Sequence, residues 1–337
     1  MRQLEAFTLG KKFGHPEANE DSLVVMPHLG YAVIDGVTDR NGTRYDGMLS
    51  GQFASRTVKR AVEEFLLAQG QPGKPDLQFQ GGEHFVDYLG KAIYAGYVSN
   101  NAVAAVEADW KVRGGCTVMA AIVVGDRLEV VAVGDSGLRI NGSDILQVLK
   151  PLDDVTAILR REAWHYFAAL GRSVEDCDAY SAAMTWQGTQ NQLAGTATAD
   201  ASVIQAVEAR ALAACRAHLP NVPERELLLL IQHGIAHGQG DFQNVTGPVL
   251  GYGGIDGFVV PSRYVETRSY ALADVETIEL FSDGYFKLGS EFGVASWEAA
   301  FAEVEAEDVH KIGRYMSTKG TTATQLTDDR SYLGVRL

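Results

Sequence analysis

The chain has 337 residues, of which 46% are hydrophobic and 21% charged, a balance typical of a folded globular protein and not of a disordered one. Its 43 acidic and 29 basic residues give a formal net charge of −14, which argues against a nucleic acid as the main ligand because phosphate backbones are bound by basic patches. No uncharged apolar stretch reaches about 18 residues, the length that a membrane helix requires.

The first third of the chain predicts strands followed by two long helices. Alternating apolar residues at 23–35 predict two short strands joined by a turn at 26–30. Apolar residues spaced three and four apart predict an amphipathic helix over residues 51–67. Glycines and prolines at 70–82 predict a surface loop, and a second long helical pattern runs over 85–112.

The rest of the chain combines an antiparallel hairpin with a helical insertion. Two β-rich runs at 116–124 and 128–133 flank a short Gly-Asp-Arg turn and predict a hairpin. Residues from about 151 to 245 are rich in alanine, arginine and glutamate and predict helices. Further elements are expected as strands at 257–260, 278–281 and 333–337 and as a helix at 294–307. Clustered hairpins with helices between them favour an α+β layered fold over a doubly wound parallel one.

Five short acidic motifs stand where predicted strands begin or end. They are Asn19-Glu20-Asp21, Asp35-Gly36, Gly134-Asp135-Ser136, Ser282-Asp283-Gly284 and Asp328-Asp329. Each alone is compatible with a solvated turn, because Asp-Gly and Gly-Asp are common turn dipeptides. Together, Glu20, Asp35, Asp283 and Asp328 offer the oxygen ligands that Mg²⁺ and Mn²⁺ prefer. Two such ions would lower the pKa of a shared water for attack on phosphorus.

The order of these motifs resembles that of the type 2C, metal-dependent serine/threonine protein phosphatases, in particular their bacterial members. The resemblance runs over nearly the whole chain, and Gly114-Gly115-Cys116-Thr117 adds the strand opening that lies between the second and third acidic motifs. The resemblance implies a single domain over residues 1–337, with the helical insertion at about 151–245. It also implies a four-layer α/β/β/α sandwich with two central antiparallel sheets.

The resemblance further implies two Mn²⁺ or Mg²⁺ ions. Asp35, Asp283 and Asp328 would hold one ion, and Glu20, Asp35 and the Gly36 carbonyl would hold the other. Asp21 would orient a metal-bound water, so that Asp21, Asp35 and Asp283 are the residues expected to act in catalysis. In some members a third, weaker ion binds at the Gly-Asp-Ser aspartate, which here would be Asp135 together with Asp283.

Two features depart from the family pattern. The phosphate-binding arginine that many members carry before the first acidic motif is replaced by the stretch His15-Pro16-Glu17-Ala18, which leaves Lys11, Lys12 or His15 as candidates for that role. The histidine that follows Asp-Gly in many eukaryotic members is absent, since the chain reads Asp35-Gly36-Val37-Thr38-Asp39. His15 or a metal-bound water would then protonate the leaving group. The insertion is larger than the usual flap, and Arg263 and Arg268 are further candidates for phosphate or partner contacts.

The sequence therefore predicts a metal-dependent phosphoric monoester hydrolase that acts on phosphoserine and phosphothreonine in proteins and binds neither nucleic acid nor membranes. One alternative keeps this chemistry but acts on a small phosphorylated metabolite, and another is a catalytically silent sensor or adaptor with the phosphatase fold. Asp39 and Asp329 are expected to face solvent. The pair His233 and His237 has zinc-motif spacing but lacks the glutamate of that motif.

Cysteine usage and the first residues bear on the compartment. The three cysteines, Cys116, Cys177 and Cys215, are odd in number and contain no CxxC pair, which favours a reducing compartment. Cys116 opens an apolar strand and is expected to be a buried small hydrophobe. The first 14 residues contain several charges and lack a continuous apolar core with a small-residue cleavage site, so no secretory signal is expected. A cytoplasmic location is therefore expected.

Overall fold

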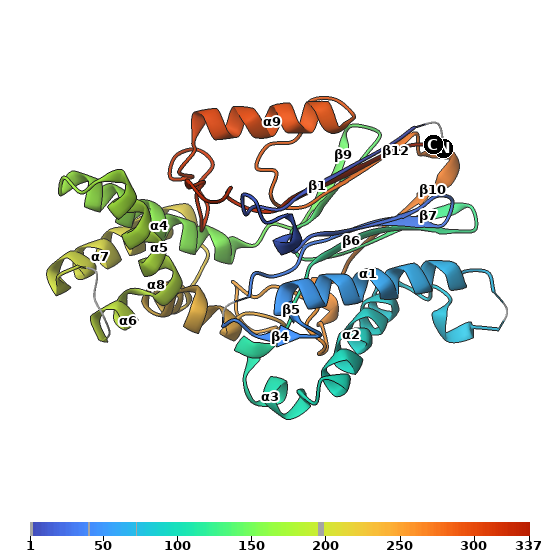
Figure 1. Ribbon diagram of the computed structural model, residues 1–337, viewed down its shortest axis with the longest axis horizontal. Helices are drawn as coiled ribbons and strands as arrows, with labels where there is room; N and C mark the ends of the chain where they lie inside the picture. The colour runs from blue at the N-terminus through green and yellow to red at the C-terminus, as the bar shows by residue number, and fades with distance from the viewer. Residues whose placement is uncertain (1–2, 40, 72, 195–198) are drawn as a thin grey trace. The chain divides into compact units, whose positions relative to one another are not determined.

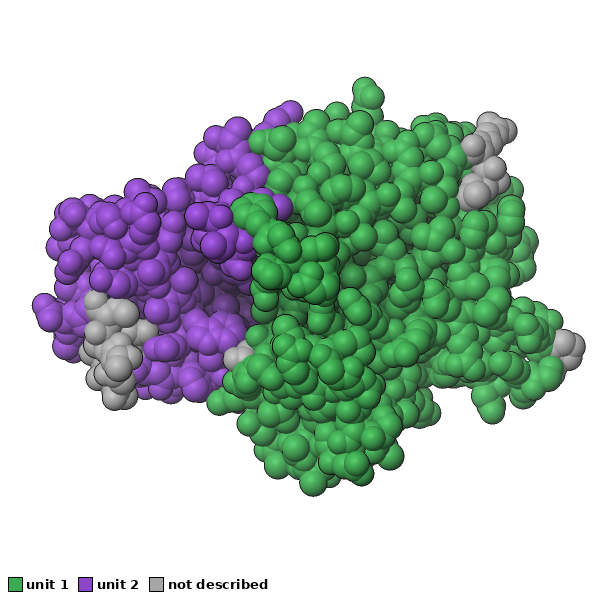
Figure 2. All heavy atoms as spheres, in the orientation of Figure 1, with its two compact units in different colours: residues 1–149, 253–302, 328–337 green, residues 150–252, 303–327 purple. Residues whose placement is uncertain are grey.

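The computed structural model describes residues 3–39, 41–71, 73–194 and 199–337. The chain divides into two units, which are coloured separately in Figure 2. The first comprises residues 1–149, 253–302 and 328–337, and the second comprises residues 150–252 and 303–327. Every acidic motif named above lies in the first unit. The single domain with one insertion stays a prediction, and the second unit contains a later segment in addition to the predicted helical one.

The first unit is built on two five-stranded sheets in which all neighbouring strands are antiparallel. One sheet has the order β1 (Gln3–Leu9), β12 (Arg330–Arg336), β11 (Thr277–Phe281), β8 (Gly137–Ile140), β9 (Asp144–Gln147). The other has the order β10 (Glu266–Ala271), β7 (Arg127–Val133), β6 (Val118–Val124), β3 (Gly30–Ile34), β2 (Ser22–Met26). A separate two-stranded ribbon pairs β4 (Arg44–Tyr45) with β5 (Met48–Leu49).

Alternation along the strands sends one set of side chains between the sheets and the other set to the outer helices. Tyr31 and Val33 of β3 join the core between the sheets, together with Leu280 and Leu333 of the facing sheet. Ile34, from the opposite face of β3, packs in the cluster that contains residues of α1 (Ser50–Ala68) and α2 (Gly82–Ser99). Figure 1 shows these two helices on the outer face of one sheet and α9 (Val294–Glu307) on that of the other. The predicted α+β, four-layer α/β/β/α sandwich is confirmed.

Most of the predicted elements of this unit are present. The strands of the first hairpin are β2 and β3, and those of the second are β6 and β7. The first predicted helix is α1, which buries Phe53, Val58 and Phe65 as its spacing requires. The helix expected at 294–307 has the bounds of α9.

Two predicted elements of this unit are wrong. The helix predicted over 85–112 ends at Ser99, because Asn101 takes a left-handed φ of 54° that a helix cannot continue through. The chain then forms the short α3 (Val103–Ala108) and a 3₁₀ turn at Trp110–Val112. Residues 257–260 form no strand, since Gly257 has a φ of 93° and breaks the extended run at its first position. The strands β1, β8, β9 and β10 were not predicted.

The second unit is mainly helical. Its helices are α4 (Pro151–Ala169), α5 (Val174–Gln187), α6 (Thr189–Ala194), α7 (Ala201–His218) and α8 (Glu224–Gly238). They enclose a core of their own, in which Ile158 and Phe167 of α4 are fully buried with Ile204 of α7 and Leu227 of α8. Among the described residues, no helix of the chain has the length and apolar character needed to cross a membrane.

The histidine pair of zinc-like spacing does not lie on one regular helical face. Gly234, between His233 and His237, has φ 64° and ψ −171° and kinks α8. A Cβ at Gly234 would lie 2.4 Å from the backbone nitrogen of Gly188, so close packing of two backbones accompanies the kink. Within the described part of the chain neither histidine belongs to a cluster that could hold a metal ion.

Candidate metal centre

Three carboxylates converge where strands of the two sheets end. Asp35 follows β3, Asp135 follows β7 after one glycine, and Asp283 follows β11 after one serine. One carboxylate oxygen of each residue lies within 4.8 Å of the others. The two sheets of the sandwich therefore bring together residues that are more than 240 positions apart in the chain, a separation that only the tertiary fold can close.

The carboxylate of Asp35 lies in an environment that disfavours its charge. Burial raises the pKa of Asp35 well above its usual value, and repulsion from Asp21, Asp328 and Asp135 raises it further, while Lys11 acts in the opposite direction. A divalent cation among these groups would favour the ionised form and offset the repulsion. The electrostatics at Asp35 thus suit an oxygen-ligated cation.

The turn after β7 sets the position of Asp135. Gly134 has a φ of 87°, and a Cβ there would lie 2.4 Å from Cγ2 of Thr117. The hydroxyls of Thr117 and Ser136 are 3.0 Å apart, and the Gln147 amide donates to the Asp135 carbonyl at 3.0 Å. The hydrogen bonds at Ser136 and at the Asp135 carbonyl therefore stabilise this turn. Its first residue, Gly134, must be glycine because of the positive φ and the close contact with Thr117.

Ser282 connects Asp21 to the ends of two strands. Its hydroxyl donates to Asp21 Oδ2 at 2.9 Å and accepts from the Ser331 amide at 2.9 Å. Burial raises the pKa of Asp21 to about 7, and repulsion from Asp329 and Asp283 adds to this while the serine hydrogen bonds oppose it. Asp21 Oδ1 is buried and has no hydrogen-bond partner in the described part of the chain.

Glycines let the segment of Glu20 approach Asp35 and the start of α1. The Gly36 amide donates to the Glu20 carbonyl at 3.2 Å. A Cβ at Gly36 would lie 2.5 Å from the Gly51 carbonyl oxygen, and one at Gly51 would lie 2.2 Å from the Val37 carbonyl oxygen. The same Cβ at Gly51 would also lie 2.8 Å from Glu20 Oε1. Side chains at either position would therefore push Glu20 and Asp35 apart.

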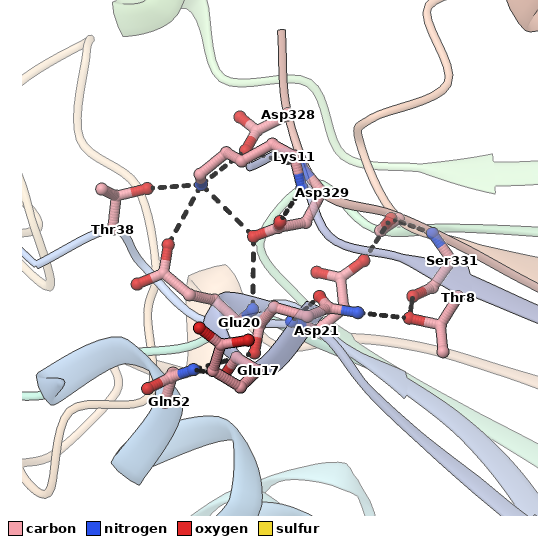
Figure 3. Close-up of polar contacts among 12 residues, drawn as sticks. Thr8, Lys11, Glu17, Glu20, Asp21, Thr38, Gln52, Asp328, Asp329 and Ser331 are labelled. Atoms are coloured by element: carbon pink, nitrogen blue, oxygen red, sulfur yellow. Dashed lines mark hydrogen bonds and ion pairs between the residues drawn. The ribbon is translucent and has the colours of Figure 1, made fainter. Parts of the chain in front are cut away.

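Lys11 is buried among the acidic residues instead of facing a solvent-exposed phosphate site. Figure 3 shows its side chain pointing toward Thr38, Glu20, Asp328 and Asp329. Its Nζ lies 3.0 Å from Glu20 Oε2, 2.9 Å from Asp328 Oδ1 and 3.3 Å from Asp329 Oδ2. It also donates to the Thr38 hydroxyl at 3.0 Å. The structure thus gathers Glu20 and Asp328 around an ammonium group, which sequence reasoning did not foresee.

The expectation that Asp329 faces solvent is wrong, because its side chain is 2% exposed. Asp329 accepts from the Lys11 amide at 2.6 Å and from the Glu20 amide at 3.2 Å. It therefore joins the start of β12 to the N-terminal segment. Asp39 is half-buried and accepts from the Thr43 amide and, at 2.8 Å, from the Ser50 hydroxyl, so it stabilises a turn before α1.

The remaining candidates lie in ordinary structural environments. Lys12 and His15 are exposed, and His15 pairs with Glu17 at 3.0 Å. Arg268 pairs with Asp144 at 2.6 Å across exposed strands. Cys116 is fully buried, and burial raises the pKa of its thiol well above the usual value, with a further contribution from Asp35. The expectation that it is a buried small hydrophobe is confirmed.

Several solved structures resemble this chain over nearly its whole length. One is the serine/threonine phosphatase Stp1 from Staphylococcus aureus, with 12% identity, a TM-score of 0.45, and coverage of 100% of this chain and 95% of that one. Another is the serine/threonine phosphatase PstP/Ppp of Mycobacterium tuberculosis, with 17% identity, a TM-score of 0.41, and coverage of 99% and 98%. A third is the catalytic domain of PstP in complex with two manganese ions, with 17% identity, a TM-score of 0.40, and coverage of 98% and 96%.

These neighbours are bacterial serine/threonine phosphatases. No protein-family model and no curated protein sequence matches the chain.

Proposed function

We propose that the chain is a divalent-metal-dependent phosphatase that hydrolyses phosphoserine and phosphothreonine in proteins. The observation that supports it most directly is the convergence of Asp35, Asp135 and Asp283, whose carboxylate oxygens lie within 4.8 Å of one another. The motif order that resembles the type 2C phosphatases supports the choice of reaction. A cytoplasmic location is part of this proposal.

The donor set fits Mn²⁺ or Mg²⁺ better than a softer metal. All of the gathered ligands are carboxylates, which suit hard divalent cations, whereas the buried Cys116 has a raised thiol pKa that disfavours thiolate ligation. Asp35, Asp135 and Asp283 would bind the ion directly. A bound ion of this kind supplies Lewis acidity at phosphorus and an activated water.

Residues of the chain itself can position a water beside this cluster. Ser282 donates to one carboxylate oxygen of Asp21, and the other, Oδ1, has no hydrogen-bond partner within the described chain. The free oxygen is the one that could accept a hydrogen bond from a water beside the cluster. Asp21 would therefore orient a water for attack on the phosphoryl group.

The proposal is tested by hydrolysis of an aryl phosphate with and without added Mn²⁺. We expect turnover only with the metal, and we expect Asp283→Asn to lower the rate by at least about 10²-fold, the order seen when a charge-stabilising group is removed. Asp274→Asn, at an exposed carboxylate of the same unit, is the matched control and should keep the rate. Metal-independent turnover, or an active Asp283→Asn enzyme, would contradict the proposal.

The class of substrate is tested separately. A phosphothreonine peptide should be hydrolysed with a higher kcat/KM than small phosphorylated metabolites such as sugar phosphates. The reverse order would favour the metabolite alternative, and binding of Mn²⁺ without turnover of either class would favour the sensor or adaptor.

A further inference from the structure

The ammonium of Lys11 lies at the meeting point of two acidic motifs from opposite ends of the chain. Its Nζ contacts Glu20 at 3.0 Å and Asp328 at 2.9 Å, and its side chain is only 5% exposed. An ammonium has three protons to donate, and four oxygens, including the Thr38 hydroxyl and Asp329, surround it within 3.3 Å. The group is therefore fully saturated by its neighbours.

The backbone holds Lys11 in this position independently of its charge. The Lys11 amide donates to Asp329 Oδ1 at 2.6 Å, and Asp329 Oδ2 accepts from the Glu20 amide at 3.2 Å. One buried carboxylate thus fixes the chain at Lys11 and at Glu20 together. The start of the Lys11 side chain is therefore held beside these acidic residues.

The electrostatic environment favours the charged form of Lys11. Three carboxylates, those of Glu20, Asp328 and Asp329, lie within 3.3 Å of Nζ and face it as the ammonium. Removing an ammonium from such a cluster would leave buried carboxylates uncompensated, which is strongly unfavourable.

A divalent ion and this ammonium cannot share the same oxygens. Mg²⁺ requires oxygens at about 2.0–2.1 Å. An ion held by Glu20 or by Asp328 would therefore compete with the ammonium, whose Nζ lies 3.0 Å from Glu20 Oε2 and 2.9 Å from Asp328 Oδ1. The ion pairs of Lys11 join it to Glu20, Asp328 and Asp329, whereas Asp35, Asp135 and Asp283 bring one carboxylate oxygen each within 4.8 Å of one another. Ser282, the neighbour of Asp283, donates to Asp21 Oδ2 at 2.9 Å, while the buried Oδ1 of Asp21 has no hydrogen-bond partner within the described chain and points to a ligand beside this cluster.

We propose that Lys11 takes the place of one divalent ion, so that the centre binds a single Mn²⁺ or Mg²⁺ at Asp35, Asp135 and Asp283 while the ammonium neutralises Glu20 and Asp328. This inference rests on the proposed function, because it concerns the same site. It replaces a two-ion arrangement by one ion and one fixed organic cation. Lys11 would then limit the affinity of Glu20 and Asp328 for a second metal ion.

The test counts ions in the purified full-length chain, stripped of metal and titrated with Mn²⁺ by calorimetry and by electron paramagnetic resonance. We expect about one Mn²⁺ per wild-type chain with the six-line spectrum of an isolated ion. Lys11→Met should bind about two ions and show the broadened, spin-coupled spectrum expected for two ions roughly 3.5–4 Å apart. Lys91→Met removes an exposed lysine of the same unit and should leave the count at one.

The possible results separate this inference from the proposed function. Two coupled ions in the wild-type chain, with metal-dependent hydrolysis, would overturn the role of Lys11 and leave the phosphatase proposal intact. One ion in both the wild type and a folded Lys11→Met would also overturn it. No bound ion together with no hydrolysis would refute both. Should Lys11→Met fail to fold by circular dichroism, the wild-type count and spectrum decide alone.

Discussion

Replacing Glu279 tests whether a buried ion pair beneath the candidate site holds the first unit together. Glu279 lies on β11, two residues before the turn that leads to Asp283, and is fully buried. Its Oε2 accepts from Arg139 Nε at 2.6 Å and its Oε1 from Arg139 Nη2 at 2.7 Å. Oε1 also accepts from the Trp297 indole at 3.0 Å and from the Tyr332 hydroxyl at 2.9 Å. The carboxylate thus connects β8, β11, β12 and α9.

The expected cost of Glu279→Gln follows from these contacts. The substitution removes the acidic partner of Arg139, which is 5% exposed, and places an amide NH₂ opposite the guanidinium at one of the two oxygen positions. Leaving one member of a buried pair uncompensated costs about 3–5 kcal/mol. The double variant R139M/E279Q removes the charge as well, while its amide oxygen can still accept from Trp297 and Tyr332. It should therefore cost no more than about 2 kcal/mol, since buried ion pairs replaced as a whole are often nearly neutral.

The assay is urea unfolding followed by circular dichroism for the wild type, both single variants and the double variant. Asp144→Asn is the matched control, because it breaks the 2.6 Å pair with Arg268 at a site where both side chains are about 40% exposed or more, and it should cost at most about 1 kcal/mol. A cost below about 1 kcal/mol for Glu279→Gln would refute the reasoning. A double variant as unstable as the sum of the two single variants would refute it equally, since no coupling would remain.

Two further predictions concern the site. Gly51→Ala should destabilise the fold by about 1–3 kcal/mol and weaken Mn²⁺ binding, because its Cβ would lie 2.2 Å from the Val37 carbonyl oxygen and 2.8 Å from Glu20 Oε1. Gly73→Ala, in open space, is its control in melting curves and calorimetry. The folded-state pKa of Asp21, about 7, lies above the unfolded value of about 3.9, so the metal-free chain should lose up to a few kcal/mol as pH rises from 4 to 7. Asp21→Asn should flatten that loss in melts with chelator, and a wild-type chain that gains stability over this range would contradict it.

The sequence predicted the layers of the first unit because its strands and helices follow simple periodicities. The β2–β3 and β6–β7 hairpins and the helices α1 and α9 carry clear alternating or three-and-four patterns, and the structure contains all of them. β1 and β10 were not predicted because they lie at sheet edges. Most of their residues are exposed or half-buried there, so the alternation of apolar and polar residues is weak. The second helix is predicted too long because a single residue with left-handed φ, Asn101, ends it, and the spacing of apolar residues does not change at that position.

Some residues of the candidate site could be predicted from local sequence motifs, and the roles of others depend on the tertiary structure. Asp35, Asp135 and Asp283 could be predicted from the sequence because each stands next to a glycine or serine at the end of an apolar strand. This local motif can be recognised without knowledge of the tertiary structure. Lys11 and Asp329 carry no such signal, since a lysine after a strand and the second aspartate of a pair are both common on surfaces. Their roles arise only when β1 pairs with β12, which brings residues more than 300 positions apart into hydrogen-bonding distance. A buried cation supplied by that pairing is therefore a property of the tertiary structure, and the number of metal ions that the centre holds depends on it.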